Sequence, residues 1–351
     1  MIIAVFIPHG GCPERCHFCD QKTSGGTPVS AKHVTDTIDA HLASQSAELS
    51  SAKTPKPELA FYGGTFTAMP RDRQLAYLNA AKPYFEKGLI GSLRIATRSD
   101  ALDEQWLITL RDEYFLKTVE LGAQSFSSSV LQSLGRSHSV QSIDEGVKLL
   151  KRLGLTSSLH MMIGCPGEPH DEDQRTLSGI EKLRPDYVRI HPLLVIEGTE
   201  LERRFKLDKA FVPLGLDVAI ERAAWLVERI EALGVKVIRL GLQPNDLLDL
   251  KVVAGPYHPA FGDLVRGRMA RNQIARRLDE LKPTSKGQVL KLLVSRSLVG
   301  SLKSRAGGNL EWLQARYAAS EVVIEETLEP HTLSAQFLSP KQTLAPDPVT
   351  C

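Results

Sequence analysis

Short apolar runs typical of strands alternate with longer amphipathic stretches over most of the first 240 residues. Seven runs are expected as strands: Ile2–Ile7, Leu59–Tyr62, Leu93–Thr97, Thr118–Gln124, Ser157–Ile163, Tyr187–His191 and Val235–Leu240. Helical periodicity lies between them, as in Gln74–Phe85, Ile143–Leu153 and Val218–Leu233. Gly154 and Gly234 follow two of these helices, where left-handed caps are expected. Six or seven such units predict an α/β fold, a partial (β/α) barrel with its chemistry at the carboxyl ends of the strands.

Three cysteines, Cys12, Cys16 and Cys19, form a CxxxCxxC pattern directly after the first expected strand. Each thiolate can bind one iron of a [4Fe–4S] cluster, and because such clusters usually take four cysteines, one iron stays open for a ligand. The alternative is a structural zinc site with His9 or His17 as the fourth ligand. The spacing favours the cluster and leaves a Cys₃His zinc site open.

The segment from Pro8 to Asp20, PHGGCPERCHFCD, resembles the cluster loop of radical S-adenosylmethionine (SAM) enzymes, including the aromatic Phe18. Residues 1 to about 260 look most like the radical domain of the Elongator catalytic subunit and its short bacterial relatives, and more distantly like oxygen-independent coproporphyrinogen oxidase. The resemblance implies that SAM chelates the open iron, that the reduced cluster cleaves SAM, and that the resulting radical abstracts hydrogen from substrate. It also implies a low-potential electron donor of the flavodoxin or ferredoxin type.

Two strand-end motifs are similar to SAM-binding segments of these enzymes. Gly63, Gly64 and Thr65 follow the second expected strand and resemble the family's Gly-Gly-Glu or Gly-Gly-Thr motif, in which glycines allow the backbone to approach a ligand. Gln124 ends the fourth strand and Arg136 lies twelve residues on, as in enzymes where both contact SAM. Taken alone, a glycine pair is more often a tight turn, and a strand-end Gln is more often solvated.

The third and fifth strands depart from the porphyrinogen oxidases. Ala96 replaces their ribose-binding Glu, which favours the Elongator-like branch and leaves Thr97 as a polar substitute. His160 occupies the position of their adenosine-contacting Asp and is a further cofactor candidate, although a strand histidine is more often a core residue. Cys165 lies in a turn that resembles the family's GLPGE segment, and we assign it no role because strand-end cysteines usually pack.

The last two expected strands carry polar residues on one face, because side chains alternate along a strand. They are Tyr187, Arg189 and His191, followed by Arg239, Gly241 and Gln243. These residues are expected either to face the substrate or, for the two arginines, to balance buried carboxylates. His138, after Arg136, is expected to be solvated or catalytic.

We expect a core domain over residues 1–255, a small basic module over 256–330 and a Pro-bearing tail over 331–351. The segment from Leu264 to Arg305 contains eleven basic residues and two acidic ones, Asp279 and Glu280, which gives a local excess of nine positive charges. The basic residues are Arg266, Arg268, Arg271, Arg276, Arg277, Lys282, Lys286, Lys291, Arg296, Lys303 and Arg305. Such clustering is typical of RNA-phosphate contact or of a solvated helix face.

The module's elements suggest a second link to RNA. Val289–Val294 reads as a strand, followed by a helix, a glycine loop within Gly300–Asn309, a helix to Arg316 and the strand Glu321–Ile324. That order is similar to a KH-like module, whose glycine loop clamps nucleic-acid backbone. Too little chain remains for the acetyltransferase domain of the Elongator subunit, so carboxymethyl transfer is not implied.

Composition agrees with an enzyme of a reducing compartment. The chain has 351 residues, is 42% hydrophobic and carries a formal net charge of +2. Five cysteines, three of them in one loop, argue against a disulfide framework and for a cytoplasmic location. Met1–Ile7 is too short for a signal or membrane helix, so no membrane partner is expected. We predict a radical enzyme acting on RNA or tRNA; the alternatives are a porphyrinogen-type enzyme and a non-catalytic iron–sulfur or zinc protein that binds RNA.

Overall fold

The computed structural model describes residues 1–20, 29–44, 55–207, 211–243, 250–281, 288–330 and 332–338. The chain forms two compact units. The larger unit comprises residues 1–215 and 229–257, and the smaller one comprises residues 216–228 and 258–351. Within the described ranges, no helix combines the length and the apolar character needed to cross a membrane.

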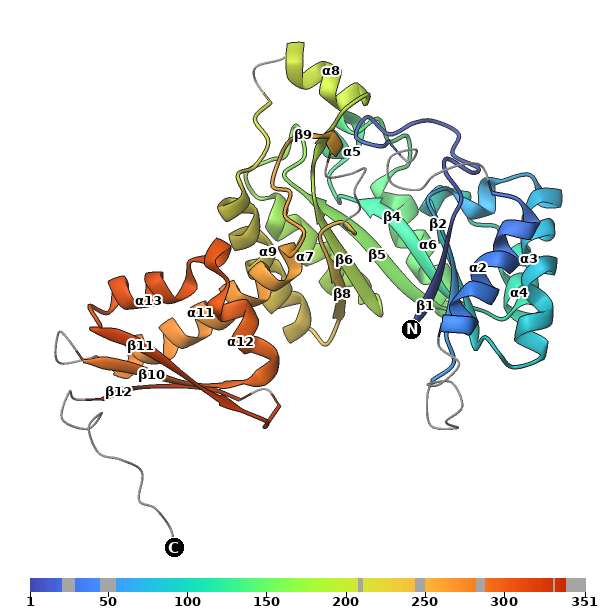
Figure 1. Cartoon of the computed structure of the whole chain (residues 1–351). Helices are drawn as coiled ribbons and strands as arrows, with labels where there is room; N and C mark the ends of the chain where they lie inside the picture. Colours follow the sequence, from blue (N-terminus) through green and yellow to red (C-terminus); the bar gives the residue numbers. More distant parts are fainter. Residues whose placement is uncertain are drawn as a thin grey trace, which may run out of the picture. The chain divides into compact units, whose positions relative to one another are not determined.

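The larger unit is built on a curled parallel sheet of seven strands in the order β1-β2-β3-β4-β5-β6-β8 (Figure 1). The strands are β1 (Ile2–Phe6), β2 (Glu58–Tyr62), β3 (Ser92–Thr97), β4 (Leu116–Gln124), β5 (Thr156–Ile163), β6 (Tyr187–Pro192) and β8 (Lys236–Leu240). Every neighbouring pair is parallel. This is the partial (β/α) barrel that the alternating sequence pattern predicts, and each strand lies within a few residues of its expected run.

Helices cover the outer face of this sheet (Figure 1). They are α2 (Ala31–Ser44), α3 (Arg71–Glu86), α4 (Glu104–Tyr114), α6 (Val140–Arg152) and α7 (Glu172–Leu183). The unit also contains α5 (Ser128–Ser133), the turns η1 (Phe66–Ala68) and η2 (Ser99–Ala101), and α8 (Glu200–Leu207), which lies apart from the seven-stranded sheet in Figure 1. Local sequence fixes their ends: the Ser139 side chain accepts a bond from Ser142 N at the start of α6, and Gly154 adopts φ +67° after its end. A small antiparallel pair, β7 (Val195–Ile196) and β9 (Val252–Ala254), completes the unit.

Alternation along the strands separates an apolar face from a polar one. Leu59 and Phe61 on β2, like Val188 and Ile190 on β6, are almost completely buried. Residues of the opposite parity are polar on several strands, so the inner surface of the curl carries charged and hydrogen-bonding groups. This polar interior is unusual for a sheet core, and it marks the concave side as the place for chemistry.

The smaller unit is an α+β module. It contains the residues 216–228 of α9 (Leu216–Ala232), then α11 (Phe261–Leu281), β10 (Val289–Ser295), α12 (Arg296–Lys303), η3 (Arg305–Gly307), α13 (Asn309–Arg316), β11 (Glu321–Thr327) and β12 (Leu333–Leu338). The sheet order is β11-β10-β12, with β10 parallel to β11 and antiparallel to β12. Its core contains residues of α11, α12, α13 and the sheet, among them Ile274, Leu292, Leu302 and Leu313.

Two expected features of this module need correction. Residues 333–338 of the expected tail form β12, which pairs with β10 and packs Leu333 and Phe337 against the module's core. The glycine loop expected from Gly300 begins after Lys303, because Gly300 lies inside α12. The order strand, helix, loop, helix, strand is otherwise as expected.

Candidate active site

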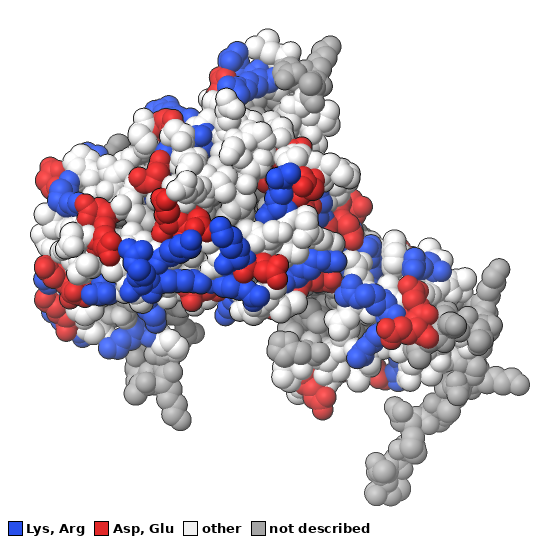
Figure 2. Space-filling view, turned by 180° about the vertical axis from the view of Figure 1, so that it is seen from behind, with Lys and Arg blue, Asp and Glu red and all other residues white. Residues whose placement is uncertain are grey.

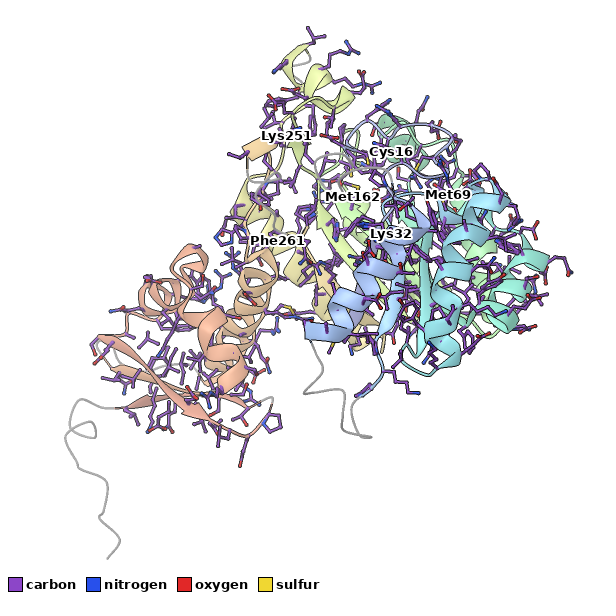
Figure 3. All side chains as sticks on the ribbon, turned by 45° about the vertical axis from the view of Figure 1, so that its right-hand side comes forward. Cys16, Lys32, Met69, Met162, Lys251 and Phe261 are labelled. Carbon is purple, nitrogen blue, oxygen red and sulfur yellow. The ribbon has the colours of Figure 1, made fainter. Side chains whose placement is uncertain are left out.

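The three cysteines lie on the loop that follows β1, at the carboxyl edge of the sheet. Cys12, Cys16 and Cys19 are half-buried, and none is in a disulfide among the described residues. The amide of Cys19 donates to the carbonyl of Cys16 (3.1 Å), which makes a tight turn between two of the thiols. Figure 3 shows Cys16 at the same end of the sheet as Met162, which is the second-last residue of β5.

A partly buried ion pair fixes this loop to the barrel. Glu14, between the first two cysteines, accepts bonds from Arg98 Nη1 (2.8 Å), from Ser137 N (2.9 Å) and from Ser137 Oγ (2.6 Å). The bonds from Ser137 and then from Arg98 lower the pKa of Glu14 to about 2. Asp100 accepts from the same guanidinium (2.8 and 2.6 Å). Sequence reasoning missed this clamp; the only local signal was an arginine directly after the third strand.

The glycine pair lets the cysteine loop pack onto the end of β2. A Cβ on Gly64 would lie 2.2 Å from the carbonyl oxygen of Gly10, so no other residue fits there without displacing the loop. Thr65 N donates to the same carbonyl (2.7 Å), and Thr65 Oγ1 lies 3.5 Å from Cys12 Sγ. Gly63 adopts φ +92°, a conformation that favours glycine. This segment therefore supports the loop from below.

Arg136 connects the cysteine loop to β4. Its Nη1 donates to Cys16 Sγ (3.3 Å) and its Nη2 donates to the carbonyl of Gly122 (2.6 Å). Its Nε donates to His138 Nδ1 (3.1 Å). Arg136 therefore ties the middle cysteine of the loop to the end of β4.

His138 is buried, so the expectation of a solvated residue is wrong. Only 4% of its surface is exposed, and its Nε2 lies 3.2 Å from the carbonyl of Ala123. Burial, followed by the charge of Arg136, lowers the pKa of His138 to about 4. The neutral ring therefore donates from Nε2 to Ala123 and accepts at Nδ1 from Arg136. It holds Arg136 in place.

Gln124 presents a polar group without a protein partner. It adopts φ +66° at the end of β4, and in the described part of the chain its buried Oε1 accepts no hydrogen bond. A Cβ on Gly122 would lie 3.0 Å from Gln124 Nε2 and 3.4 Å from Arg136 Nη2, so a glycine there leaves room for both side chains. A strained backbone together with an unsatisfied buried oxygen is typical of a ligand site.

Thr97 is placed differently from the other cofactor candidates. Its hydroxyl is buried and lies 2.6 Å from Thr67 Oγ1, which in turn donates to the carbonyl of Ala101 (2.5 Å). The side chain thus ties β3 to η1. The side chains of Gln124 and Arg136 both lie close to Gly122, and Arg136 donates to Cys16, while the Thr97 hydroxyl is engaged within the protein.

The interior of the barrel holds a network of charges. Glu120 on β4 accepts from Arg94 Nη1 (2.7 Å), from Arg189 Nη1 (2.6 Å) and from the hydroxyl of Tyr62 (3.0 Å). Arg94 also donates to Glu58 (2.6 Å). The two arginines outweigh burial and lower the pKa of Glu120. Arg189 therefore balances a buried carboxylate, one of the two roles expected from the sequence.

Two histidines lie next to Arg189: His160 is its register partner on β5, and His191 follows it by two residues on β6. The rings of His160 and His191 pack edge to face with centroids 4.2 Å apart. Burial lowers the pKa of His160 to about 3, and it places the pKa of His191 well below its ordinary value, so both are neutral. Among the described residues, neither buried Nε2 has a hydrogen-bond partner.

His17 is engaged outside the cysteine loop. Its Nδ1 lies 2.9 Å from the carbonyl of Ser133, and its Nε2 lies 3.3 Å from Arg204 Nη2 on α8. The described residues contain no group of three or more His, Cys, Asp or Glu side chains placed to hold a metal ion. A zinc site would need its ligands to converge on one ion, whereas each cysteine of a [4Fe–4S] cluster binds a different iron.

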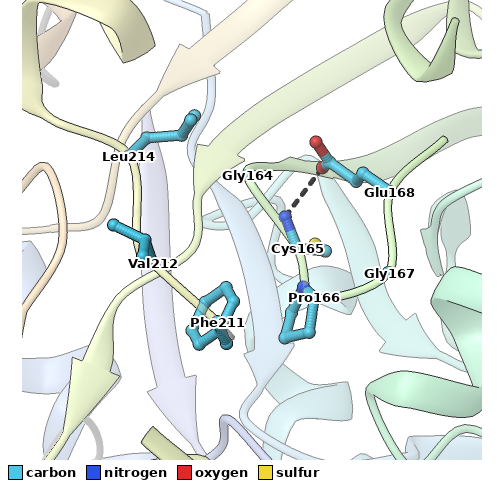
Figure 4. A pocket seen from close by; sticks show the side chains of 8 residues that line it. All are labelled: Gly164, Cys165, Pro166, Gly167, Glu168, Phe211, Val212 and Leu214. Carbon is cyan, nitrogen blue, oxygen red and sulfur yellow. Dashed lines mark hydrogen bonds between the residues drawn. The ribbon is translucent and has the colours of Figure 1, made fainter. Parts of the chain in front are cut away.

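A pocket of about 420 Å³ opens beside the turn after β5 (Figure 4). It is lined by Gly164, Cys165, Pro166, Gly167, Glu168, Phe211, Val212 and Leu214. Glu168 accepts from the amide of Cys165 (2.7 Å), which closes the turn. The Cys165 side chain is buried in an apolar cluster with Met162 and Phe18, as expected for a packing cysteine.

Two arginines of the basic segment are buried and paired, although its charge count would allow all of them to be exposed. Arg268 and Arg271 on α11 are only 3% and 8% exposed. Arg268 donates to Glu221 (2.6 Å) and Asp217 (2.5 Å) on α9. These acids lie outside the counted segment, so the local excess of nine charges overstated the free charge. In Figure 2, basic side chains of the smaller unit lie next to acidic ones, and a larger band of Lys and Arg crosses the other unit.

A curled parallel sheet with a three-cysteine loop at its carboxyl edge defines an α/β barrel enzyme of the iron–sulfur class. The model of the Radical SAM superfamily matches residues 6–178, and that of the Radical_SAM C-terminal domain matches residues 185–271. The chain belongs to the radical SAM superfamily, whose members are enzymes that use a [4Fe–4S] cluster and SAM.

Several relatives carry names that refer to tRNA. The chain is 28% identical over 300 residues to a tRNA uridine(34) acetyltransferase of Methanocaldococcus infernus, covering 75% of this chain and 55% of that protein. It is 30% identical over 205 residues to an uncharacterised protein of Methanocaldococcus jannaschii, covering 56% and 62%. The solved structure of the M. infernus Elp3 with an N-terminal deletion matches with a TM-score of 0.58 and 24% identity, over 78% of this chain and 63% of that one. The chain spans about half the length of the tRNA-named archaeal relatives.

Proposed function

We propose that this radical SAM enzyme acts on RNA, with tRNA as the substrate class. The observation that carries the proposal is the similarity to proteins named tRNA uridine(34) acetyltransferase over 75% and 78% of this chain. Because the chain spans only about half of those proteins, their acetyl transfer is not part of the proposal.

The residues at the carboxyl edge of the sheet fit the superfamily's cofactors. Cys12, Cys16 and Cys19 would hold the cluster, because their half-buried thiols lie on one short loop at this edge and Arg136 donates to the sulfur of Cys16. Gln124 fits a polar part of SAM, since its buried Oε1 lacks a partner within the described residues. We include Gly63, Gly64, Thr65, Thr97, Arg136 and His160 in the same proposed cofactor site. When bound, the cluster and SAM supply reductive cleavage of SAM and removal of hydrogen from the substrate.

The chain's own residues position these groups and exclude water. Glu14 and Arg98 fix the cysteine loop, and His138 holds Arg136 against Cys16. The neighbouring apolar cluster of Phe18, Met162 and Leu201 seals one side of the loop. A rigid, closed edge of this kind protects a radical from solvent.

Transfer of hydrogen from RNA tests the substrate class directly. Reduced, cluster-loaded protein is given SAM and bulk tRNA from cells grown in deuterated medium. We expect 5′-deoxyadenosine to gain deuterium and its release to rise with tRNA, because the hydrogen that the radical removes comes from the substrate. Coproporphyrinogen III serves as the small-molecule comparison.

Release that tRNA does not stimulate, with no deuterium transfer, would overturn the RNA proposal. Stimulation by coproporphyrinogen in its place would support the porphyrinogen-type alternative. The Cys16→Ala variant is the matched control, because it removes a proposed iron ligand and should release no product with either substrate.

A further inference from the structure

The inner wall formed by β5, β6 and β8 carries buried polar atoms for which the described residues supply no hydrogen-bond partner. His160, Arg189 and Arg239 lie side by side in the register of the three strands. Within the described residues, three buried atoms of this wall have no partner: Arg189 Nε and the Nε2 atoms of His160 and His191. An unpaired buried polar group costs about 1 to 3 kcal/mol. A group of them on one wall indicates a polar ligand that the protein itself does not supply.

The charge of this wall is also unbalanced. In the described network, Glu58 and Glu120 face three arginines, Arg94, Arg189 and Arg239. Arg94 and Arg189 share the two carboxylates, whereas Arg239 donates only to the neutral amide of Gln243 in the described part of the chain. The charge of Arg189 lowers the pKa of Arg239, after the larger effect of burial. Among the described residues, this network therefore carries one excess positive charge.

The histidines strengthen the preference for an anion. His191 is neutral, and the charges of Arg189 and Arg239 both act on it, so protonating it would add a third positive charge. A neutral imidazole still donates one hydrogen bond. The ring of His160 packs edge to face against that of His191 and fixes its orientation. A cation is excluded by repulsion from the two arginines, and a neutral ligand would leave the excess charge uncompensated.

We propose that Arg189, His191 and Arg239 form a binding site for an oxyanion of the substrate, a carboxylate or a phosphate. The inference rests on the proposed function, because the site lies inside the barrel where the substrate must meet the radical. Two guanidinium groups and one imidazole match the acceptor oxygens of such a group, and charge-assisted bonds of this kind are the strongest that side chains form. The site holds the substrate through this oxyanion. Glu120 accepts from Arg189 Nη1 and so fixes the position of the guanidinium group.

Calorimetric titration of small anions tests this site. The full-length, cluster-loaded protein is kept oxidised with excess SAM, so that the open iron is occupied and no turnover occurs. The probes are malonate, inorganic phosphate and the neutral malonamide. We expect malonate or phosphate to bind and malonamide not to bind. The Arg239→Gln variant should weaken anion binding at least about tenfold, because it removes a charged donor.

Two further variants complete the design. His191→Phe keeps an aromatic ring but removes the donor, and it should also weaken anion binding. Arg203→Gln changes an exposed arginine on α8 that pairs with Glu200, and it should leave binding unchanged. A preference for malonate identifies the oxyanion as a carboxylate, and a preference for phosphate identifies a phosphate.

Any of three results would overturn the proposal: no binding of either anion, equal binding of malonamide, or equal anion binding by wild type and Arg239→Gln. Because the titration needs no turnover, its failure would leave RNA-dependent SAM cleavage standing. Conversely, a failure of tRNA to donate hydrogen would leave the anion titration intact.

Discussion

Buried arginines occur in both units, but their partners differ. In the barrel, Arg94 and Arg189 pair with Glu120, whose side chain is only 4% exposed. On α11, Arg268 is equally buried, yet its partners Asp217 and Glu221 are 85% and 51% exposed. The first arrangement removes both charges from water, whereas the second buries an arginine stem and leaves the carboxylates hydrated. Only the first creates an interior in which a ligand's charge is decisive.

Removing the central carboxylate of the barrel should have the largest effect. Glu120→Gln removes the carboxylate partner of Arg189 and leaves Arg94 with Glu58 alone among the described residues, and we expect it to reduce the free energy of unfolding by about 3 to 5 kcal/mol. Urea unfolding of the apoprotein measures the loss. The matched control is Glu221→Gln, which removes the shared partner of Arg268 and Arg271 but should cost about 1 kcal/mol or less, since water can solvate the site. Equal losses would show that the two regions do not differ.

Glu172 offers a third case, a buried carboxylate with no ion pair among the described residues. Glu172 is the first residue of α7 and accepts a hydrogen bond from Ser125 Oγ (2.5 Å). Burial raises the pKa of Glu172 to about 7. Between pH 4.5 and 7 the folded state therefore holds the proton more tightly than the unfolded state, so this group's contribution to stability falls as pH rises through that window.

Glu172→Gln should remove this pH dependence. We expect the free energy of unfolding of the variant to exceed that of wild type by about 1 to 3 kcal/mol at pH 8 and to equal it near pH 4.5. Chemical unfolding at the two pH values measures the difference. Glu181→Gln, on the exposed side of the same helix, should change stability at neither pH. A gain of the same size at both values would contradict the assigned pKa.

The smallest effect is expected at the surface of the smaller unit. Arg276 pairs with Glu228 at 3.3 Å, and its side chain is 60% exposed. Arg276→Ala should therefore change the free energy of unfolding by less than about 1 kcal/mol, and raising the salt concentration should reduce even that difference. Urea unfolding at low and high salt measures it. A loss close to that of Glu120→Gln would mean that α11 depends on ion pairs as strongly as the barrel does.

The fold was largely predictable because its periodicity is local. Period-two apolar runs predict strands, and glycines such as Gly154 mark the ends of helices, without reference to distant residues. The position of Gln124 at the end of β4 follows from the run that predicts this strand. The clamp between Glu14 and Arg98 was not predictable, since 84 positions separate the two residues and the cysteine pattern around Glu14 gives no sign of its partner. The burial of Arg268 could not be predicted for the same reason, because its partners on α9 lie about fifty residues earlier in the chain.

The module's boundaries show a second limit of sequence reasoning. β12 lies in a stretch that proline content marked as a tail, and only its pairing with β10 reveals it as a strand. A charge count over residues 264–305 likewise could not include the acids of α9. Local composition predicts charge density, but folding decides which charges remain available to a partner.

The central claim is that the loop of Cys12, Cys16 and Cys19, with Gln124 beside it, forms the site of SAM cleavage. The most direct test measures 5′-deoxyadenosine released by reduced, reconstituted protein given SAM. We expect wild type to bind about four irons and to release product, and Cys16→Ala to release none. Gln124→Ala should retain cleavage at saturating SAM while binding SAM about five- to tenfold more weakly, because it loses one hydrogen bond of roughly 1 kcal/mol. Product release by Cys16→Ala at the wild-type rate, or colourless wild-type protein that holds a single zinc, would contradict the account.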